Sequence, residues 1–233
     1  MSNIYCIIDA CSYIYLNQFT FIVNEKDASL YDLLKKTNFI TLKHSRTIAD
    51  EIKRNVKITM KEALSIDNHV YKFQRGHLDR YDKSLFNNTI NMSGNDKGEK
   101  ENIAVAIDLF LNRKYSIIYL SDDKKATGET GHLKEIMLAF PYYQIWSSFE
   151  VVLFLYFNFN KQYFDYSRAL DSLRDLVAFV FNAKRLDLIK KKKGGVITND
   201  EYSREIQLVN TKAQKCLLSY TERIDIIRNL IAA

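Results

Sequence analysis

Four short apolar runs, each followed by a longer stretch of helical periodicity, limit what the first two thirds of this chain can fold into. The runs cover Ile4–Ile8, residues 39–42, Ser116–Leu120 and Tyr143–Trp146. They are short and continuously apolar, which is typical of parallel strands buried on both faces. Strands that alternate with helices predict an α/β fold with a central, mostly parallel sheet.

The stretches between these runs predict the helices. Periodicity is clearest over residues 99–112, where Ile103, Ala106, Ile107 and Phe110 recur on one face. Further helices are expected over residues 12–23, 30–36, 45 or 47 to 57, 61–72, 132–140 and 147 or 148 to 157. Residues 58–97 form a polar insert, and the Asn-, Gly- and Ser-rich segment 87–98 is expected to be a loop.

The character of the sequence changes after Asn158. Two long helical stretches follow, over about residues 161–192 and 200–231, and glycines between them end the first helix readily. We therefore expect two parts. Residues 1–158 form the α/β domain, and residues 159–233 form a C-terminal helical hairpin.

The formal net charge of +6 lies almost entirely in the C-terminal part. Residues 159–233 contain 14 Lys and Arg against 9 Asp and Glu, whereas residues 1–158 contain 20 against 19. A positive excess suits a polyanionic partner such as RNA.

The cysteines and the apolar segments indicate the cellular compartment. Cys6, Cys11 and Cys216 lack the spacing of a zinc site or a disulfide framework. No apolar stretch approaches the length of a membrane span, and the first residues lack the basic segment of a signal peptide. We expect a cytoplasmic protein with no membrane partner.

Acidic residues follow the predicted strands or lie in the predicted helices between them. They are Asp9, Glu51, Glu99, Glu101, Asp122 and Asp123. Carboxylates at the carboxyl edge of a parallel sheet can converge, and converging carboxylates suit Mg²⁺ or Mn²⁺. Each acid also has a plain alternative: a helix cap or turn, an ion pair of Glu51 with Arg54, or a favourable charge at a helix start.

Four segments in order resemble the motifs of the PIN-domain family. The strand with Asp9-Ala10-Cys11-Ser12 is similar to the family's opening motif, and residues 48–52 resemble the family's helix that carries its second acid. Residues 98–104, Gly-Glu-Lys-Glu-Asn-Ile-Ala, resemble the third site, and Leu120-Ser121-Asp122-Asp123 resembles the fourth. The closing strand and residues 147–153 also fit, so the resemblance covers about residues 1–158.

The resemblance implies a PIN-like three-layer α/β/α fold and a metal-dependent endoribonuclease that cuts single-stranded RNA with Mg²⁺ or Mn²⁺. It implies Asp9, Glu51, Glu101 and Asp123 as metal ligands and Ser121 as the hydroxyl near the metal. Glu99 and Asp122 are second choices. Cys11 departs from the family, which has a small hydroxyl or amide residue there.

The resemblance also implies a cellular role. A toxin of a toxin–antitoxin pair or a defence effector would need an inhibitor protein as partner, and the helical hairpin could bind that partner, bind substrate or form a homo-oligomer. Two alternatives stay open: a non-catalytic PIN-like module that binds RNA or protein, and a different acid-dependent α/β hydrolase such as a phosphatase.

Two basic groups are candidates for RNA binding. Lys190, Lys191, Lys192 and Lys193 form a run at the end of a predicted helix, where cations also favour the helix dipole. Arg75 and Arg80 lie among aromatic residues of the polar insert, and such aromatics either stack on bases or simply pack.

Overall fold

The computed structural model describes residues 4–23, 26–74, 76–77, 97–113, 116–123 and 143–232. The chain divides into two compact units, and each is described by itself. The first comprises Met1–Thr20 and Tyr31–Ser148, and the second comprises Phe21–Leu30 and Phe149–Ala233.

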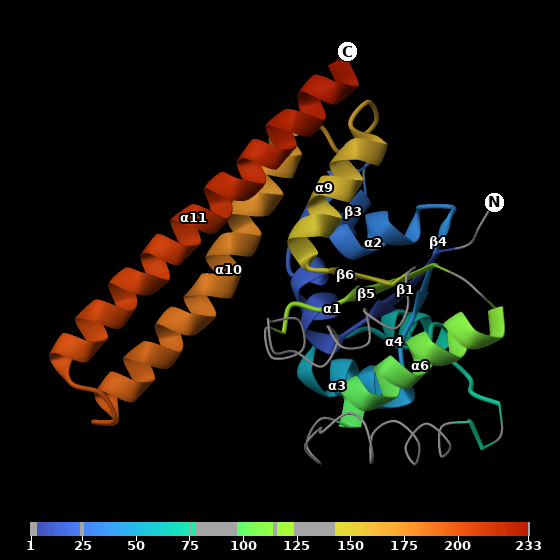
Figure 1. Cartoon of the computed structure of the whole chain (residues 1–233), viewed down its shortest axis with the longest axis horizontal. Helices are drawn as coiled ribbons and strands as arrows, with labels where there is room; N and C mark the ends of the chain where they lie inside the picture. The colour runs from blue at the N-terminus through green and yellow to red at the C-terminus, as the bar shows by residue number, and fades with distance from the viewer. Residues whose placement is uncertain are drawn as a thin grey trace. The chain divides into compact units, whose positions relative to one another are not determined.

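Four parallel strands form the sheet of the first unit (Figure 1). Their spatial order is β4 (Ile40–Lys43), β1 (Ile4–Ile8), β5 (Ser116–Leu120) and β6 (Tyr143–Trp146). Ile4 pairs with Ile40 on one side and with Ser116 on the other. The strands coincide with the four apolar runs within one residue, so the predicted α/β class with a central, mostly parallel sheet is confirmed.

One part of the core of this unit lies between the sheet and α6 (Lys97–Arg113), which packs on β1 and β5. One face of the sheet contributes Tyr5, Ile7, Ile117, Tyr119 and Tyr143 to a buried cluster with the apolar face of α6. Every second residue of a strand points to the same face, which explains this set. Full burial of each large apolar side chain stabilises the fold by roughly 1.5–3 kcal/mol.

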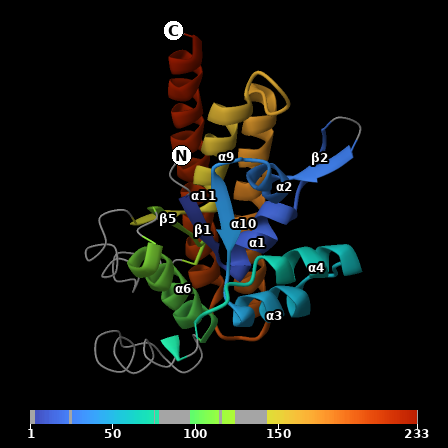
Figure 2. The same cartoon turned by 90° about the vertical axis from the view of Figure 1, so that its right-hand side faces the viewer.

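Four shorter helices complete the described part of the first unit. They are α1 (Ala10–Asn17), α2 (Leu30–Lys35), α3 (Arg46–Asn55) and α4 (Met60–Asn68). In Figure 1, α3, α4 and α6 lie on one side of the sheet and α2 lies on the other, and Figure 2 shows α3 beside α4. Ser45 caps α3 by accepting from the Ile48 N–H, and Thr59 and Glu62 form a capping box on α4.

Some predicted elements differ from the structure. The helix expected over residues 12–23 ends at Asn17, and β2 (Thr20–Val23) pairs with β3 (Lys26–Ser29). The β-branched residues of Thr20–Val23 favour a strand. The loop expected up to residue 98 is wrong for Lys97 and Gly98, which begin α6. Residues 87–96 and the helix predicted over residues 132–140 lie outside the described residues.

In the described residues of the second unit, the helices follow one another as α9 (Ser148–Phe159, whose first residue belongs to the first unit), α10 (Tyr166–Lys193) and α11 (Asn199–Ala232). α10 and α11 pack along one another, as the two long periodic stretches predict. Gly195 takes a positive φ of 68° in the turn between them, which side chains disfavour. The Tyr166 hydroxyl donates to Asp225 Oδ1 at 2.7 Å, and Arg185 Nε donates to Asn210 Oδ1 at 2.9 Å across the pair.

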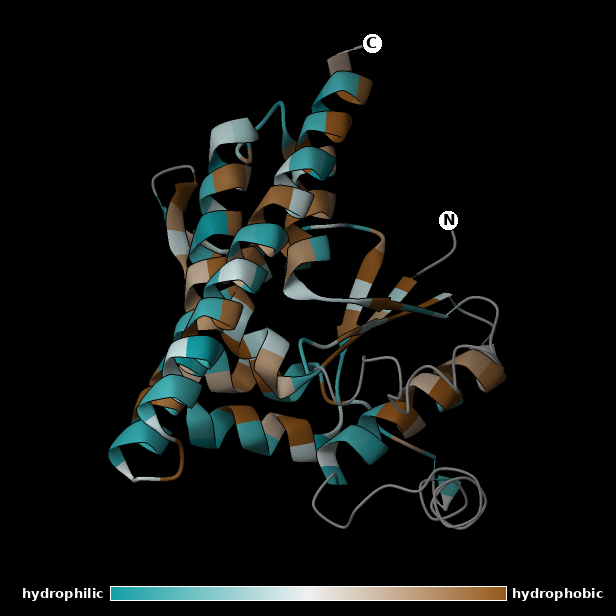
Figure 3. Cartoon of the chain, turned by 60° about the vertical axis from the view of Figure 1, so that its left-hand side comes forward, coloured by the Kyte–Doolittle hydropathy of each residue, from teal (hydrophilic) through white to brown (hydrophobic). Residues whose placement is uncertain are grey.

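The polarity of α10 and α11 changes along the length of the helix pair. Figure 3 shows mostly hydrophilic colour around the turn end of α10 and α11, where the lysine run lies. Within the part of the chain that the structure describes, no helix combines the length and apolar character needed to cross a membrane.

Candidate functional site

The parallel sheet brings the ends of β1 and β5 to one edge. The Asp9 N–H donates to the Leu120 carbonyl at 3.0 Å, so Asp9 lies directly beside the segment that carries Ser121 and Asp123. Asp9 is also the N-cap of α1, and its side chain accepts from the Ala10 N–H at 2.8 Å. This edge, beyond the carboxyl ends of the strands, is where open α/β sheets bind ligands.

Three donors fix the Asp9 carboxylate. Besides Ala10, the Cys11 thiol donates to Oδ2 at 3.1 Å and the Ser121 hydroxyl donates to the same oxygen at 3.0 Å. Burial and the neighbouring Asp9 charge raise the pKa of Cys11, so at neutral pH its thiol keeps the proton that it donates. The Asp123 N–H in turn donates to Ser121 Oγ at 3.2 Å, so Ser121 connects the two acids.

A polar pocket of about 190 Å³ opens at this edge. Its described lining consists of Asp9, Cys11, Ile48, Glu51, Gly98, Glu99 and Asp123. Four carboxylates from four separate segments therefore face one cavity, and none of its described lining residues is cationic. Such crowding of like charges favours either protonation or a bound cation.

The pKa shifts reflect this crowding. Burial raises the pKa of Asp9, and the Asp123 charge adds to the effect, although the hydrogen bonds to Cys11, Ala10 and Ser121 oppose it. Burial and the Asp9 charge also raise the pKa of Glu51, against a smaller opposing effect of Arg54.

Glycine at residue 98 allows the helices of the pocket to meet closely. A Cβ atom at Gly98 would lie 2.8 Å from Ile48 Cδ1, closer than side chains tolerate. Glycine here lets the start of α6 approach α3 without displacing the end of the Ile48 side chain, and the next residue, Glu99, lines the pocket.

Glu101, expected as the third metal ligand, is not among the pocket's lining residues. Its Oε2 accepts from the Thr47 N–H at 3.2 Å, and its Oε1 lies 3.9 Å from Lys97 Nζ. Glu101 thus caps the first turn of α3 by accepting a hydrogen bond from one of its N–H groups, which have no partner within the helix. The structure brings Asp9, Glu51 and Asp123 together with Glu99 instead.

Asp122 is also held outside the pocket lining. Its carboxylate accepts from Ser12 Oγ at 2.6 Å, from Ser148 Oγ at 2.5 Å and from the Ser148 N–H at 3.0 Å. These bonds connect the end of β5 to α1 and to Ser148, which lies two residues after β6. The geometry gives Asp122 a supporting role at the sheet edge.

Sequence reasoning missed Asn102, which connects three of the segments around the site. This fully buried side chain donates to the Ile8 carbonyl at 2.9 Å and accepts from the Ser45 N–H at 2.7 Å. It fastens α6 to the end of β1 and to the cap of α3. The available signal is its position four residues before Ala106, on the apolar face of the helix.

The donor set has the chemistry that a hard divalent cation prefers, since all four charged groups are carboxylates. As the described side chains stand, however, no three His, Cys, Asp or Glu residues among them form a group that could hold a metal ion. The pocket thus matches a divalent cation in the type and charge of its ligands, but not in the distances between them. Binding would require side-chain rotations that draw the carboxylates closer.

The lysine run lies in the second unit, in the last turn of α10. Lys191 pairs with Asp187 at 2.7 Å, and Lys192 Nζ lies 4.5 Å from the centre of the Tyr202 ring. Lys190 and Lys193 are exposed and have no ion pair among the described residues. Arg75 and Arg80, the other candidates for RNA contact, lie outside the described residues.

Comparisons of this chain with protein-family models, with curated proteins and with solved structures find no match.

Proposed function

We propose that this chain is a metal-dependent endoribonuclease with a PIN-like three-layer domain, acting on single-stranded RNA. The observation that carries the proposal is the convergence of Asp9, Glu51, Glu99 and Asp123 on one pocket without a described cation. Anionic RNA would be repelled by such a pocket unless positive charge compensated it. A bound cation would reduce both the repulsion among the four carboxylates and the repulsion between the pocket and RNA.

Asp9, Glu51, Glu99 and Asp123 would hold Mg²⁺ or Mn²⁺. Such an ion lowers the pKa of a bound water and neutralises charge that develops on phosphate oxygens. The protein's own part is positioning. Ser121 and Cys11 donate to Asp9 and keep its carboxylate oriented, and Asn102 fixes the start of α6 against β1.

The RNA-binding role belongs in this proposal to the exposed lysines at the end of α10. Lys190 and Lys193 are not engaged in described ion pairs, so their charge is available to phosphates. A toxin or defence role with an inhibitor protein, and a role in self-association for the hairpin, rest on the family resemblance alone.

Cleavage of a labelled single-stranded RNA tests the proposal. We expect cutting with Mn²⁺ or Mg²⁺, none with EDTA, and a loss of at least ~100-fold in Asp9→Asn and Asp123→Asn. Asp50→Asn is a matched control, because Asp50 is exposed on α3 beside Glu51. If both variants cut as fast as the wild type, the assignment of the pocket is wrong.

A non-catalytic RNA- or protein-binding module is the second candidate. It is favoured by the absence of a ready-made metal group among the described residues. Calorimetry with Mn²⁺ separates the two functions: the nuclease should bind Mn²⁺ with an affinity that Asp9→Asn reduces, whereas the binding module should take up RNA without Mn²⁺ binding.

A further inference from the structure

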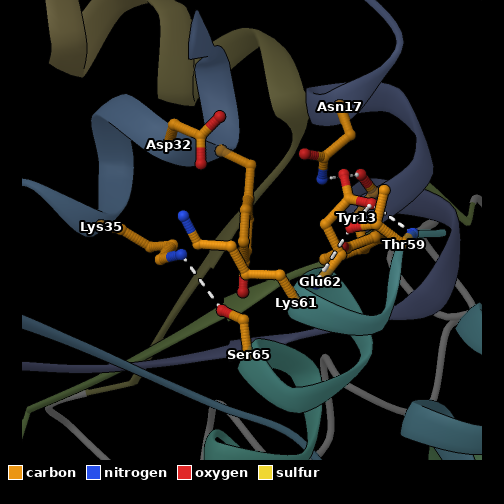
Figure 4. A pocket seen from close by; sticks show the side chains of 9 residues that line it. Tyr13, Asn17, Asp32, Lys35, Thr59, Lys61, Glu62 and Ser65 are labelled. Atoms are coloured by element: carbon orange, nitrogen blue, oxygen red, sulfur yellow. Dashed lines mark hydrogen bonds between the residues drawn. The ribbon is translucent and has the colours of Figure 1, made fainter.

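A second pocket of about 350 Å³ lies in the first unit, between α1, α2 and α4 (Figure 4). Its walls carry a dense set of polar side chains on an aromatic base. They are Tyr13, Asn17, Tyr31, Asp32, Lys35, Thr59, Lys61, Glu62 and Ser65. The volume falls in the range of small-molecule sites, which is roughly 300–1,000 Å³.

This pocket is distinct from the carboxylate pocket. Cys11 of α1 lines the carboxylate pocket, whereas Tyr13 and Asn17 line the second one. Successive residues of an α-helix are rotated by about 100°, so residues two apart point in nearly opposite directions. The helix α1 thus separates the two cavities, which have no described lining residue in common.

Two buried phenols face the second pocket. Tyr13 and Tyr31 are only 5% and 4% exposed, and their rings meet edge to face at 4.8 Å. Neither hydroxyl has a hydrogen-bond partner among the described residues, and neither oxygen is among the fully buried unpaired polar atoms, so both are accessible from the pocket. Burial, followed by the charges of Glu62 and Asp32, raises the pKa of Tyr13 to about 12, so its hydroxyl remains a donor.

Two cations lie on the walls. Lys35 Nζ donates to Ser65 Oγ at 3.2 Å and lies 5.5 Å from the centre of the Tyr31 ring. Figure 4 shows the Lys61 side chain extending across the same opening. Two ammonium groups and two phenol hydroxyls together present donors suited to a phosphate group.

Two acids complete the lining. Glu62 accepts from the Thr59 N–H at 2.6 Å and from its hydroxyl at 2.7 Å, which fixes its carboxylate at the pocket wall. Asp32 lies on α2 on the same side as Lys35 (Figure 4). Carboxylates accept hydrogen bonds from ribose hydroxyls and from the amino groups of bases.

We propose that this pocket binds a nucleoside monophosphate unit, either as a free nucleotide or as one residue of an RNA chain. The phosphate contacts Lys35, Lys61 and the tyrosine hydroxyls, while Asp32 and Glu62 accept from the sugar or base. Recognition is by hydrogen bonds and charge, because Lys35 covers the ring of Tyr31 and leaves less room for stacking. The site does not depend on cleavage at the carboxylate pocket.

Titration of the full chain carrying Asp9→Asn with AMP, CMP, GMP and UMP in EDTA tests this site independently of metal and catalysis. We expect saturable binding by calorimetry for at least one nucleotide, and much weaker binding of its nucleoside and of inorganic phosphate. Lys61→Ala should weaken binding roughly tenfold, as expected for a lost charge-assisted bond. Lys57→Ala, an exposed lysine outside the pocket, is the control.

Tyr13→Phe removes only a hydroxyl and should also weaken binding, with an unchanged melting temperature, whereas Tyr15→Phe on the same helix should not. A short RNA oligonucleotide that displaces the nucleotide identifies the RNA chain as the source, and one that fails to displace it identifies the free nucleotide. No saturable binding up to ~10 mM, or binding that both Lys61→Ala and Tyr13→Phe leave unchanged, overturns the inference. Either result leaves the nuclease proposal to its own test.

Discussion

The carboxylate pocket and the lysine run at the end of α10 concentrate charge in opposite ways. The four acids of the pocket come from segments up to 114 positions apart, between Asp9 and Asp123, and the fold collects them in a partly buried cavity. The lysines are consecutive in sequence, lie on an exposed helix end and are screened by water. Single changes should therefore have large effects in the pocket and small ones in the lysine run.

The largest contrast is expected between two neighbouring acids of α3. Glu51→Gln should lower RNA cleavage by on the order of 100-fold, because it removes a carboxylate that faces the pocket. Asp50→Asn changes an exposed acid that pairs with Lys53 at 3.5 Å, and cleavage should stay within about twofold of wild type. Equal rates for the two variants would remove Glu51 from the site.

A difference in acid sensitivity is expected between the two units. His44 is buried at the end of β4, and burial lowers its pKa to about 4. The unfolded chain takes up this proton near pH 6.5 but the folded state only near pH 4, so folding stability falls as the pH drops through that window. The contribution lost by pH 4 is roughly 3 kcal/mol.

Urea unfolding followed by fluorescence of Trp146, the single tryptophan and a residue of the first unit, measures this loss. His44→Gln cannot titrate and should show a smaller drop between pH 7 and pH 4 than the wild type. The second unit contains no histidine, so this effect is confined to the first. Identical pH profiles for wild type and His44→Gln would contradict the assignment.

A smaller contrast is expected within the first turns of α6. Glu99→Gln should weaken Mn²⁺ binding about tenfold, because Glu99 lines the pocket. Glu101→Gln should leave Mn²⁺ affinity nearly unchanged and reduce thermal stability slightly, since Glu101 accepts from the Thr47 N–H. If Glu101→Gln weakens Mn²⁺ binding in calorimetry and Glu99→Gln does not, Glu101 is the metal ligand, as the motif first predicted.

These two glutamates show what the sequence could and could not predict. The motif resemblance favoured Glu101, yet the structure places Glu99 in the pocket lining and Glu101 against the Thr47 N–H of α3. Glu99 and Glu101 each lie four residues before a fully buried residue, so the apolar pattern of α6 does not choose between them. The choice depends on the contacts of α6 with distant segments, which motif spacing does not contain.

Other parts of the fold were predictable to different degrees. The strands of the sheet were predicted because each is continuously apolar, a pattern that follows directly from burial on both faces. The strand Thr20–Val23 was missed because a four-residue strand after a short helix can be mistaken for its continuation. The supporting roles of Asn102 and Asp122 depend on contacts between distant segments, which no local pattern contains.

The smallest effect is expected at the lysine run. Replacing Lys190 and Lys193 by Glu should weaken RNA binding a few-fold in ~0.15 M salt and flatten the dependence of affinity on salt by roughly one unit of slope per lost phosphate contact. Lys212→Glu with Lys215→Glu, on exposed positions of α11, is the control for net charge. If the lysine variant and the control pair show the same dependence of RNA affinity on salt, Lys190 and Lys193 do not contact RNA phosphates and the run is a solvated helix end.

A crystal structure of the chain grown with Mn²⁺, with anomalous diffraction at the manganese edge, tests the convergence of the acids most directly. The proposal predicts an anomalous peak in the pocket, with oxygens of Asp9 and Asp123 and of at least one of Glu51 and Glu99 within about 2.6 Å of it. An empty pocket at millimolar Mn²⁺, with the carboxylates turned away from one another, would contradict it.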